Sequence, residues 1–172
     1  TYLVSPGSSA ISLLRTASDS MRKKLGLAWQ ARSPNVQLQT PEEALILASI
    51  IEKETGRDAD RTLISAVFHN RLRIGMRLQS DPTVIYGVGN SFDGDLRKVH
   101  LRTDTPYNTY TRAGLPPSPI ALPSAASLMA AVQPADSKAL YFVARGDGSS
   151  QFSESLSEHN RAVERFQLGK SR

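Results

Sequence analysis

Two glutamates near each other, Glu52 and Glu54, are the strongest candidates for acid/base chemistry in this 172-residue sequence. They follow residues 44–51, which are apolar at every position except one serine. If this segment is helical, Glu54 continues the apolar stripe of Leu47 and Ile50, and a carboxyl group there is desolvated. Desolvation raises a carboxyl pKa toward the value that a general acid needs at neutral pH. Spacing alone also allows both glutamates to be exposed in the last turn of a helix.

Other kinds of catalytic site find little support in the sequence. The absence of cysteine excludes disulfides, thiol nucleophiles and Cys-ligated zinc. The three histidines, His69, His100 and His159, are far apart and do not have the spacing of zinc ligands. No serine lies in a G-x-S-x-G nucleophile elbow. We therefore expect no metal ion.

The net charge of +5 favours a polyanionic partner, such as nucleic acid, anionic lipid or an acidic cell-wall polymer. The cationic residues are spread out, and the densest run, residues 22–24, holds only three. Because no nucleic-acid-binding motif is present, we expect a solvated basic surface and no nucleic-acid partner. The longest apolar run is too short to span a bilayer. The chain starts at Thr1 without an initiator Met, so we interpret it as a piece of a longer protein, and any membrane anchor would lie in the sequence that is not included.

A predicted helical hairpin positions the two glutamates. Thr40 suits an N-cap, Pro41 the first helical position, and Glu43 completes a capping box, which predicts a helix over 41–55 that stops at Gly56. A second helix is expected to begin near Asp58 or Asp60 and to end at Gly75. Two helices joined by so short a link form a hairpin.

The remaining predicted elements are shorter or less regular. They are a helix within 8–32, a short helix from Ser80-Asp81-Pro82 to Tyr86, a helix from about Ser124 to Val132, a strand over 140–144 paired with 151–153, and a closing helix over 157–168. The predicted fold class is α+β: the helical hairpin packs with a small antiparallel sheet and long irregular loops.

Residues 76–123 are poor in predicted regular structure, and a loop region of this length inside a domain favours a binding surface. Tyr107, Asn108 and Tyr110 in this stretch, and Asn160 near the C-terminus, carry groups that hydrogen-bond sugar hydroxyls and acetamido groups. The tyrosine rings also offer apolar faces for pyranose rings. The alternative is that each is a loop or cap residue whose polar atoms are satisfied within the protein.

Several segments, in this order, resemble the catalytic core of the MltG (YceG-like) endolytic transglycosylases. They are ASIIEKET at 48–55, VFHNRL at 67–72, GMRLQSDPTVIYG at 75–87, PYNTY at 106–110, GLPP at 114–117, LYFVA at 140–144 and EHN at 158–160. The likeness extends from about Thr1 to Phe166. It implies that residues 1–172 form one catalytic domain, with the second glutamate of the Glu-Lys-Glu-Thr motif, Glu54, as the catalytic residue.

The resemblance also implies a substrate groove and a cellular setting. We expect the groove around Glu54 to be lined by Gln79, Ser80, Asp81, Tyr107, Asn108, Tyr110 and Asn160, all of which lie in or near the matched segments. The family implies a single N-terminal membrane helix and a LysM-like region upstream of Thr1, at the periplasmic face of the bacterial inner membrane. Its substrate is the peptidoglycan glycan strand, and its expected partner is the peptidoglycan synthesis machinery.

The chemistry that the family implies needs one carboxylate and no cofactor. The glutamate protonates the leaving oxygen, then removes the proton of the muramic acid C6 hydroxyl, which attacks within the same sugar and leaves a 1,6-anhydro end. A hydrolase would need a second carboxylate. Glu52 points about 160° away on a helix, and Asp81 beside Pro82 is better explained as a helix cap occupied by backbone amides. A hydrolase using Glu52 or Asp81, and a non-catalytic glycan-binding module, remain the alternatives.

Overall fold

The computed structural model describes residues 3–169, and the expected domain over 1–172 therefore has five terminal residues outside the described ones. The described residues form seven α-helices, one 3-10 helix and one two-stranded antiparallel sheet, which confirms the predicted α+β class. The elements are α1 (Ala10–Gln30), α2 (Pro41–Glu54), α3 (Asp58–Arg73), α4 (Asp81–Val88), η1 (Gly89–Ser91), α5 (Lys98–Arg102), α6 (Ala125–Val132), β1 (Tyr141–Ala144), β2 (Ser150–Ser153) and α7 (Leu156–Phe166).

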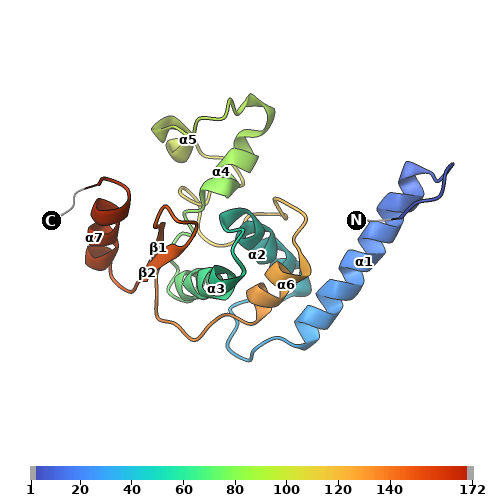
Figure 1. Ribbon diagram of the computed structural model, residues 1–172, viewed down its shortest axis with the longest axis horizontal. Coiled ribbons are helices and arrows are strands. Elements are labelled where there is room, and N and C mark those ends of the chain that lie inside the picture. The colour runs from blue at the N-terminus through green and yellow to red at the C-terminus, as the bar shows by residue number, and fades with distance from the viewer. Residues whose placement is uncertain (1–2, 170–172) are drawn as a thin grey trace.

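The core lies where α2, α3 and α6 pack together at the centre of the molecule (Figure 1). Their inward side chains are almost completely inaccessible to solvent, and burial of each large one contributes about 1.5–3 kcal/mol. The fully buried members include Leu47, Ile50 and Ile51 of α2, Ile64 and Phe68 of α3, and Leu128 and Val132 of α6. The β-hairpin joins this core through Phe142, whose ring meets Phe68 edge-on at 6.1 Å.

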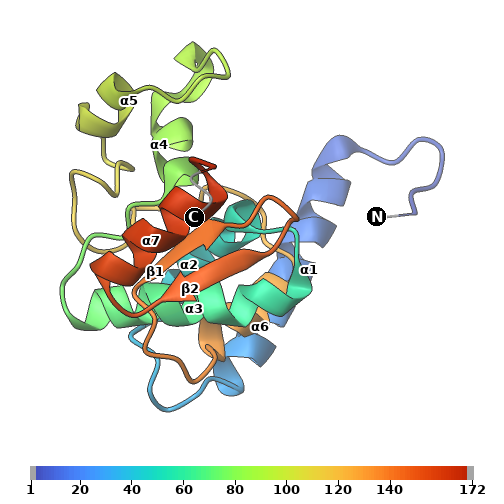
Figure 2. The ribbon, with the colours of Figure 1, turned by 60° about the vertical axis from the view of Figure 1, so that its left-hand side comes forward.

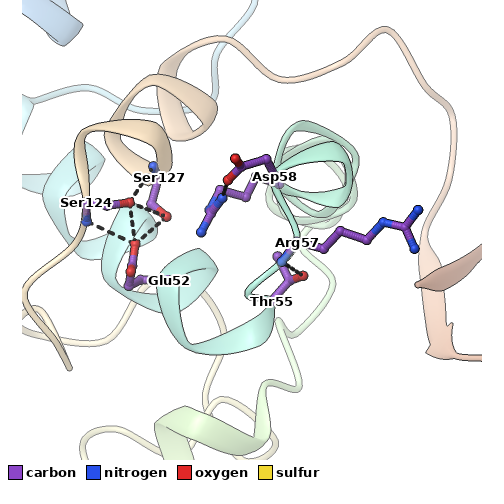
Figure 3. A network of polar contacts seen from close by, with 7 residues as sticks. Glu52, Thr55, Arg57, Asp58, Ser124 and Ser127 are labelled. Carbon is purple, nitrogen blue, oxygen red and sulfur yellow. Dashed lines mark hydrogen bonds and ion pairs between the residues drawn. The ribbon is translucent and has the colours of Figure 1, made fainter. Parts of the chain in front are cut away.

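Helix α2 begins as predicted but ends one residue earlier. The Thr40 hydroxyl accepts from the Glu43 N–H at 3.2 Å. In a capping box the Glu43 carboxylate would accept from the N–H of the N-cap residue, Thr40. Here it accepts from the N–H of the preceding residue, Gln39, at 2.5 Å. The helix stops at Glu54 because Thr55 is extended, with φ −148°, and not because of a left-handed glycine at position 56. The turn that follows is closed by a hydrogen bond from the Arg57 N–H to the Thr55 hydroxyl (Figure 3).

The stretch 76–123 contains more helix than the sequence predicts. Helix α4 runs to Val88 rather than to Tyr86, and η1 and α5 follow it as a small lobe beside the core (Figure 1). Gly87, expected in a loop, is inside α4, where it packs against residue 105: a Cβ built on it would be 2.5 Å from the Thr105 hydroxyl. The absence of a side chain at position 87 therefore permits close packing of helix and loop.

The first and last helices, α1 and α7, lie on either side of the core (Figure 1). Helix α1 extends away from the rest of the molecule and buries only Leu25 and Ala28 (Figure 1). At the other end, the predicted hairpin forms with Tyr141 opposite Ser153, and α7 packs beside it (Figure 2). Helix α7 begins at Leu156 with a capping box between Ser155 and Glu158. Among the described residues no helix is both long and apolar enough to cross a membrane.

Candidate active site

A pocket of about 350 Å³ opens beside the end of α2. It lies between α2, α3, the start of α4, the hairpin and α7, and thus draws on segments far apart in the sequence. Its lining residues are Glu54, Arg71, Gln79, Asp81, Tyr110, Tyr141, Phe142, Leu156 and His159. The combination of two carboxylic acids, several hydrogen-bonding groups and aromatic rings is typical of a small-molecule or sugar site.

Glu54 has the environment of a general acid. Its Oε1 accepts a hydrogen bond from the Ser80 hydroxyl at 2.5 Å. Desolvation raises the pKa of Glu54 to about 7; the Ser80 hydrogen bond opposes this rise, the charge of Asp81 adds to it and the charge of Arg71 opposes it. The expectation that the end of the apolar stripe raises this pKa is confirmed. The carboxyl is therefore partly protonated near neutral pH and is able to give and to take a proton.

Glu52 has a different role. Its Oε2 accepts from the Ser124 N–H at 2.9 Å, the Ser124 hydroxyl at 2.7 Å and the Ser127 hydroxyl at 2.6 Å (Figure 3). Desolvation raises the pKa of Glu52, but the hydrogen bonds from Ser127 and Ser124 outweigh it, and the pKa is lower than usual. Glu52 is thus an ionised link between α2 and the N-terminus of α6. Neither glutamate is fully exposed, so the alternative of two exposed carboxylates in the last turn is wrong.

The interpretation of Asp81 as a helix cap is wrong. Asp81 is the first residue inside α4, and Ser80 occupies the N-cap position, with its hydroxyl directed to Glu54 instead of to the helix. The partner of Asp81 is a side chain: the Tyr110 hydroxyl donates to Oδ1 at 2.6 Å. Desolvation and this bond to Asp81 raise the pKa of Tyr110, which stays protonated as the donor. Asp81 lines the pocket together with Glu54 and Tyr110.

The segment that carries Gln79 and Ser80 is held in an uncommon conformation. Gln79 has φ +50°, the only positive φ at a non-glycine position among residues 3–169. Such a conformation costs on the order of 1–3 kcal/mol and persists where neighbours fix it. Here the Gln79 N–H donates to the Thr109 carbonyl at 3.1 Å, and the Ser80 N–H donates to the Thr109 hydroxyl at 3.0 Å. The strained backbone brings Gln79 to the pocket and Ser80 to Glu54.

Asn108 does not line this pocket, which corrects the expectation that it contacts the groove. It is completely buried, and its amide nitrogen donates to three backbone carbonyls, those of His100, Leu101 and Thr103. Its amide oxygen accepts from the Tyr110 N–H at 2.8 Å. Asn108 therefore organises the loop from within and sets the position of Tyr110.

Tyr107 and Asn160 are also outside the pocket. The Tyr107 hydroxyl bonds to that of Ser118 at 2.7 Å, and its ring packs against Tyr86 with centroids 4.7 Å apart. Asn160 is exposed on α7 and follows His159, which does line the pocket. Of the seven residues expected around Glu54, the structure thus brings Gln79, Asp81 and Tyr110 to the pocket and Ser80 to the carboxylate itself.

Sequence reasoning missed five lining residues: Arg71, Tyr141, Phe142, Leu156 and His159. Four of them lie in segments that resemble the family: Arg71 in 67–72, Tyr141 and Phe142 in 140–144, and His159 in 158–160. Helical spacing marks one of these four as well. Arg71 continues the apolar stripe of Ile64 and Phe68 on α3, so a charged side chain falls on a buried face, as at Glu54. The other four come from the hairpin and α7, and only the packing of these elements against α2 and α3 brings them to Glu54.

Two other features lie away from this pocket. Among residues 3–169, no three His, Asp or Glu side chains are grouped closely enough to hold a metal ion. A larger cavity of about 640 Å³ lies at the other side of α3, between Asn35, Arg73 and Lys138. It contains none of the residues expected to act on a substrate.

Comparison with known proteins places this chain in a family. A family model described as the YceG-like family matches residues 1–165. The endolytic murein transglycosylase of Bacillus subtilis (strain 168) is 46% identical over 122 residues, which are 71% of this chain and 34% of that protein. The protein of the same name from Streptococcus pneumoniae (strain ATCC BAA-255 / R6) is 33% identical over 170 residues, 95% of this chain and 30% of that protein.

The fold also matches a solved structure. A YceG-like protein from Listeria monocytogenes superposes with a TM-score of 0.79 at 37% identity, covering 94% of this chain and 52% of that one. This chain spans about a third of the length of the curated relatives that it matches.

Proposed function

This chain belongs to the YceG-like family, and from that premise we propose that it is the catalytic domain of an endolytic lytic transglycosylase acting on peptidoglycan glycan strands. The observation that carries the proposal is the Glu54 carboxyl, which faces an open pocket with its pKa raised to about 7. The names of the two curated relatives, endolytic murein transglycosylases, support the choice of substrate.

The proposed reaction uses Glu54 twice. The protonated carboxyl gives its proton to the glycosidic oxygen between N-acetylmuramic acid and N-acetylglucosamine as the bond to C1 breaks. The carboxylate then takes the proton of the muramic acid C6 hydroxyl while that oxygen bonds to C1, which leaves a 1,6-anhydro end and a protonated Glu54. Because Ser80 donates to Oε1, the other oxygen is left for proton transfer. Attack within the same sugar has a high effective molarity.

In this proposal some of these residues contact the sugars, and others support the loop that carries Tyr110. Gln79, Asp81 and Tyr110 contact the sugars around the scissile bond, since they line the pocket with Glu54. Tyr107 and Asn108 support the loop from which Tyr110 projects. Asn160, exposed on α7, contacts a part of the strand that extends beyond the pocket.

A second candidate function is favoured by one observation. Asp81 lines the same pocket as Glu54, with only its Oδ1 engaged, by Tyr110. A hydrolase that uses Glu54 as acid and Asp81 as second carboxylate would produce free reducing ends instead of anhydro ends. Glu52 is a poor candidate for that role, because its Oε2 already receives three hydrogen bonds from α6.

The test of the proposal is cleavage of purified glycan strands by Glu54→Gln and by its neighbour Glu52→Gln. Glu54→Gln keeps hydrogen-bonding capacity but has no proton to transfer, so we expect a loss of about 10²–10⁴-fold in the rate of strand cleavage. Glu52→Gln retains an acceptor oxygen for Ser124 and Ser127 and should remain within a few-fold of wild type.

Mass spectrometry of the digested strands provides the measurement. Wild-type protein should yield anhydro-ended muropeptides, and Glu54→Gln almost none. Intact strands after incubation with folded wild-type protein would support a non-catalytic glycan-binding module instead. Full activity of Glu54→Gln together with inactivity of Glu52→Gln would reverse the assignment of the two glutamates.

The proposal extends to the setting of the whole protein. Its substrate lies outside the cytoplasmic membrane, so we propose that the enzyme acts at the outer, periplasmic face of that membrane, next to the machinery that synthesises the strands. Crosslinking in cells from the exposed α1, followed by identification of the captured proteins, tests this part of the proposal.

A further inference from the structure

Arg71 is a buried cation that connects two walls of the Glu54 pocket. Only 6% of its surface is exposed, although it is charged. Its Nε donates to the Leu140 carbonyl at 2.7 Å, and its Nη1 donates to the Leu78 carbonyl at 2.5 Å. Leu78 directly precedes Gln79 and Ser80, and Leu140 directly precedes β1. One guanidinium on α3 therefore fixes the backbone on both sides of the pocket, and its fork of fixed donors suits that role.

The Arg71 guanidinium also contacts one of two stacked aromatic rings. The guanidinium carbon lies 5.5 Å from the centre of the Tyr141 ring, within the range of a cation–π contact. The Tyr141 ring stacks on His159 with centroids 5.2 Å apart and 23° between the planes. All three residues line the pocket, and they come from α3, β1 and α7. Arg71 thus also holds the wall that completes the pocket opposite α2.

We propose that Arg71 is a positioning residue for the cleavage reaction: it holds the two walls of the pocket together and supplies the positive charge that Glu54 faces when it has given up its proton. This inference rests on the proposed function, because it assigns Arg71 a part in the proton transfer of Glu54. Arg71 acts on the reaction through Ser80, Tyr141 and Glu54, and it does not contact the reacting atoms.

No other described residue that lines the pocket offers a positive charge to the ionised Glu54 carboxylate. Among the described residues that line the pocket, Arg71 is the only permanent cation. Asp81 carries a like charge and opposes ionisation of Glu54, while Tyr110 is neutral and donates to Asp81. Desolvation, and then the charge of Arg71, lower the pKa of His159, so the imidazole is neutral at pH 7. Tyr141 contributes its aromatic ring to the pocket wall.

Two variants separate the charge of Arg71 from its geometry. Arg71→Gln removes the charge, so the pKa of Glu54 should rise and the alkaline limb of the kcat/KM profile should move to higher pH. Arg71→Lys keeps the charge but not the fork of donors, so the alkaline limb should stay in place. In both variants kcat should fall by roughly 10–100-fold, since small displacements of positioned groups are costly, while KM should change less.

The matched control is Arg73→Gln, two residues further along α3. Arg73 is exposed and lines the other cavity, so this variant should keep the wild-type kcat and pH profile. A carbon-13 NMR titration of the Glu54 carboxyl in wild type and Arg71→Gln gives a readout that does not depend on cleavage. It therefore distinguishes failure of this inference from failure of the proposed function.

We expect the titration midpoint of Glu54 to be higher in Arg71→Gln than in wild type, and kcat to be lower in Arg71→Lys than in wild type. An unchanged midpoint in Arg71→Gln would overturn the assigned role of the charge. If Arg71→Gln does not fold, Arg71→Lys decides: wild-type kcat in that variant would show that the two backbone hydrogen bonds are not needed for catalysis, and the inference would fall. Absence of any strand cleavage by wild type would count against the proposed function instead.

Discussion

Glu52 and Glu54 lie two residues apart on one helix and have opposite environments. Glu52 receives three hydrogen bonds on one oxygen and has a lowered pKa. Glu54 receives one bond from Ser80, is desolvated, and has a pKa of about 7. Since the chemical groups are identical, the direction of each side chain on the helix decides which carboxyl has a lowered pKa and which has a raised one.

Desolvation of Glu54 should also reduce the stability of the protein. The pKa is raised from 4.5 in the unfolded chain to about 7, so the folded state holds the proton more tightly between these values. The contribution of Glu54 to stability is therefore fully present below pH 4.5 and is lost as the pH rises through 7. We expect Glu54→Gln to be more stable than wild type above pH 7, by on the order of 1–3 kcal/mol.

Urea unfolding of both proteins at several pH values measures this difference in the free energy of unfolding. The difference should shrink as the pH falls toward 4.5, where wild-type Glu54 is protonated in both states. A difference that does not depend on pH would mean that Glu54 is not desolvated as described. Glu52→Gln is the control, and it should be no more stable than wild type at any pH.

The candidate site was partly predictable at the scale of single residues. Helical spacing placed Glu54 on the stripe of Leu47 and Ile50, because the period of an α-helix fixes which side chains share a face, and the resemblance to the family motif selected it over Glu52. The same logic applied to α3 marks Arg71, a cation on the face of Ile64 and Phe68. The role of Asp81 was not predictable from its neighbours, because its partner, Tyr110, comes from a loop distant in sequence.

At the scale of elements, α4 depends on close contact with the loop around residue 105. A Cβ at Gly87 would be 2.5 Å from the Thr105 hydroxyl and 3.3 Å from the Tyr107 Cβ. The loop, in turn, is fixed by Asn108, whose amide nitrogen donates to three carbonyls. The position of Tyr110 beside Asp81 therefore depends on packing between α4 and the loop.

Gly87→Ala tests this contact. The added methyl group must displace the Thr105 side chain or the loop, which should destabilise the protein by about 1–3 kcal/mol as overpacking does. The matched control is Gly26→Ala in the exposed part of α1, where a Cβ meets nothing within 4 Å and alanine should stabilise by about 0.5–1 kcal/mol. Thermal unfolding of both variants gives the comparison. Equal stability of Gly87→Ala and wild type would show that α4 and the loop separate easily.

The regular elements were largely predictable, and the lobe between them was not. Thr40 and Pro41 predicted the start of α2, and Gly75, with φ +68°, marks the end of α3 as expected. Residues 98–102 gave no signal as a helix, because a helix of five residues offers no repeat of apolar positions. The Asn108 side chain, which lies outside this helix, donates hydrogen bonds to the carbonyls of His100 and Leu101 and so fixes the segment. Such a contact is not visible as a local sequence pattern.

At the scale of the whole molecule, buried His69 connects parts of the fold that surround the core. Its Nδ1 accepts from the Gln37 N–H at 3.0 Å, and its Nε2 donates to the Ala131 carbonyl at 2.8 Å. The loop before α2, helix α3 and helix α6 are thereby joined through one neutral ring. Desolvation lowers the pKa of His69 below 6.5, with the Ala131 hydrogen bond opposing this shift.

Protonation of His69 should therefore weaken the fold. Because its pKa is lower in the folded state than in the unfolded state, the stability that neutral His69 provides is present above pH 6.5 and is lost as the pH falls below it. His69→Gln should be less stable than wild type by about 1–3 kcal/mol at pH 7.5, and this difference should narrow toward pH 5. Thermal unfolding across this range measures it; a constant difference would contradict a neutral, buried imidazole. The control is His159→Gln, which changes the other histidine with a lowered pKa and is compared with wild type in the same unfolding experiment.

Digestion of glycan strands in heavy-oxygen water tests most directly the proposal that Glu54 acts with the C6 hydroxyl of the substrate as nucleophile. If Glu54 works without a second carboxylate, water is not incorporated, and every new muramic acid end should be an unlabelled 1,6-anhydro sugar. Asp81, which shares the pocket, makes the opposite result chemically possible. Heavy oxygen at the new sugar end would mean that water attacked, and it would contradict the transglycosylase mechanism in favour of hydrolysis.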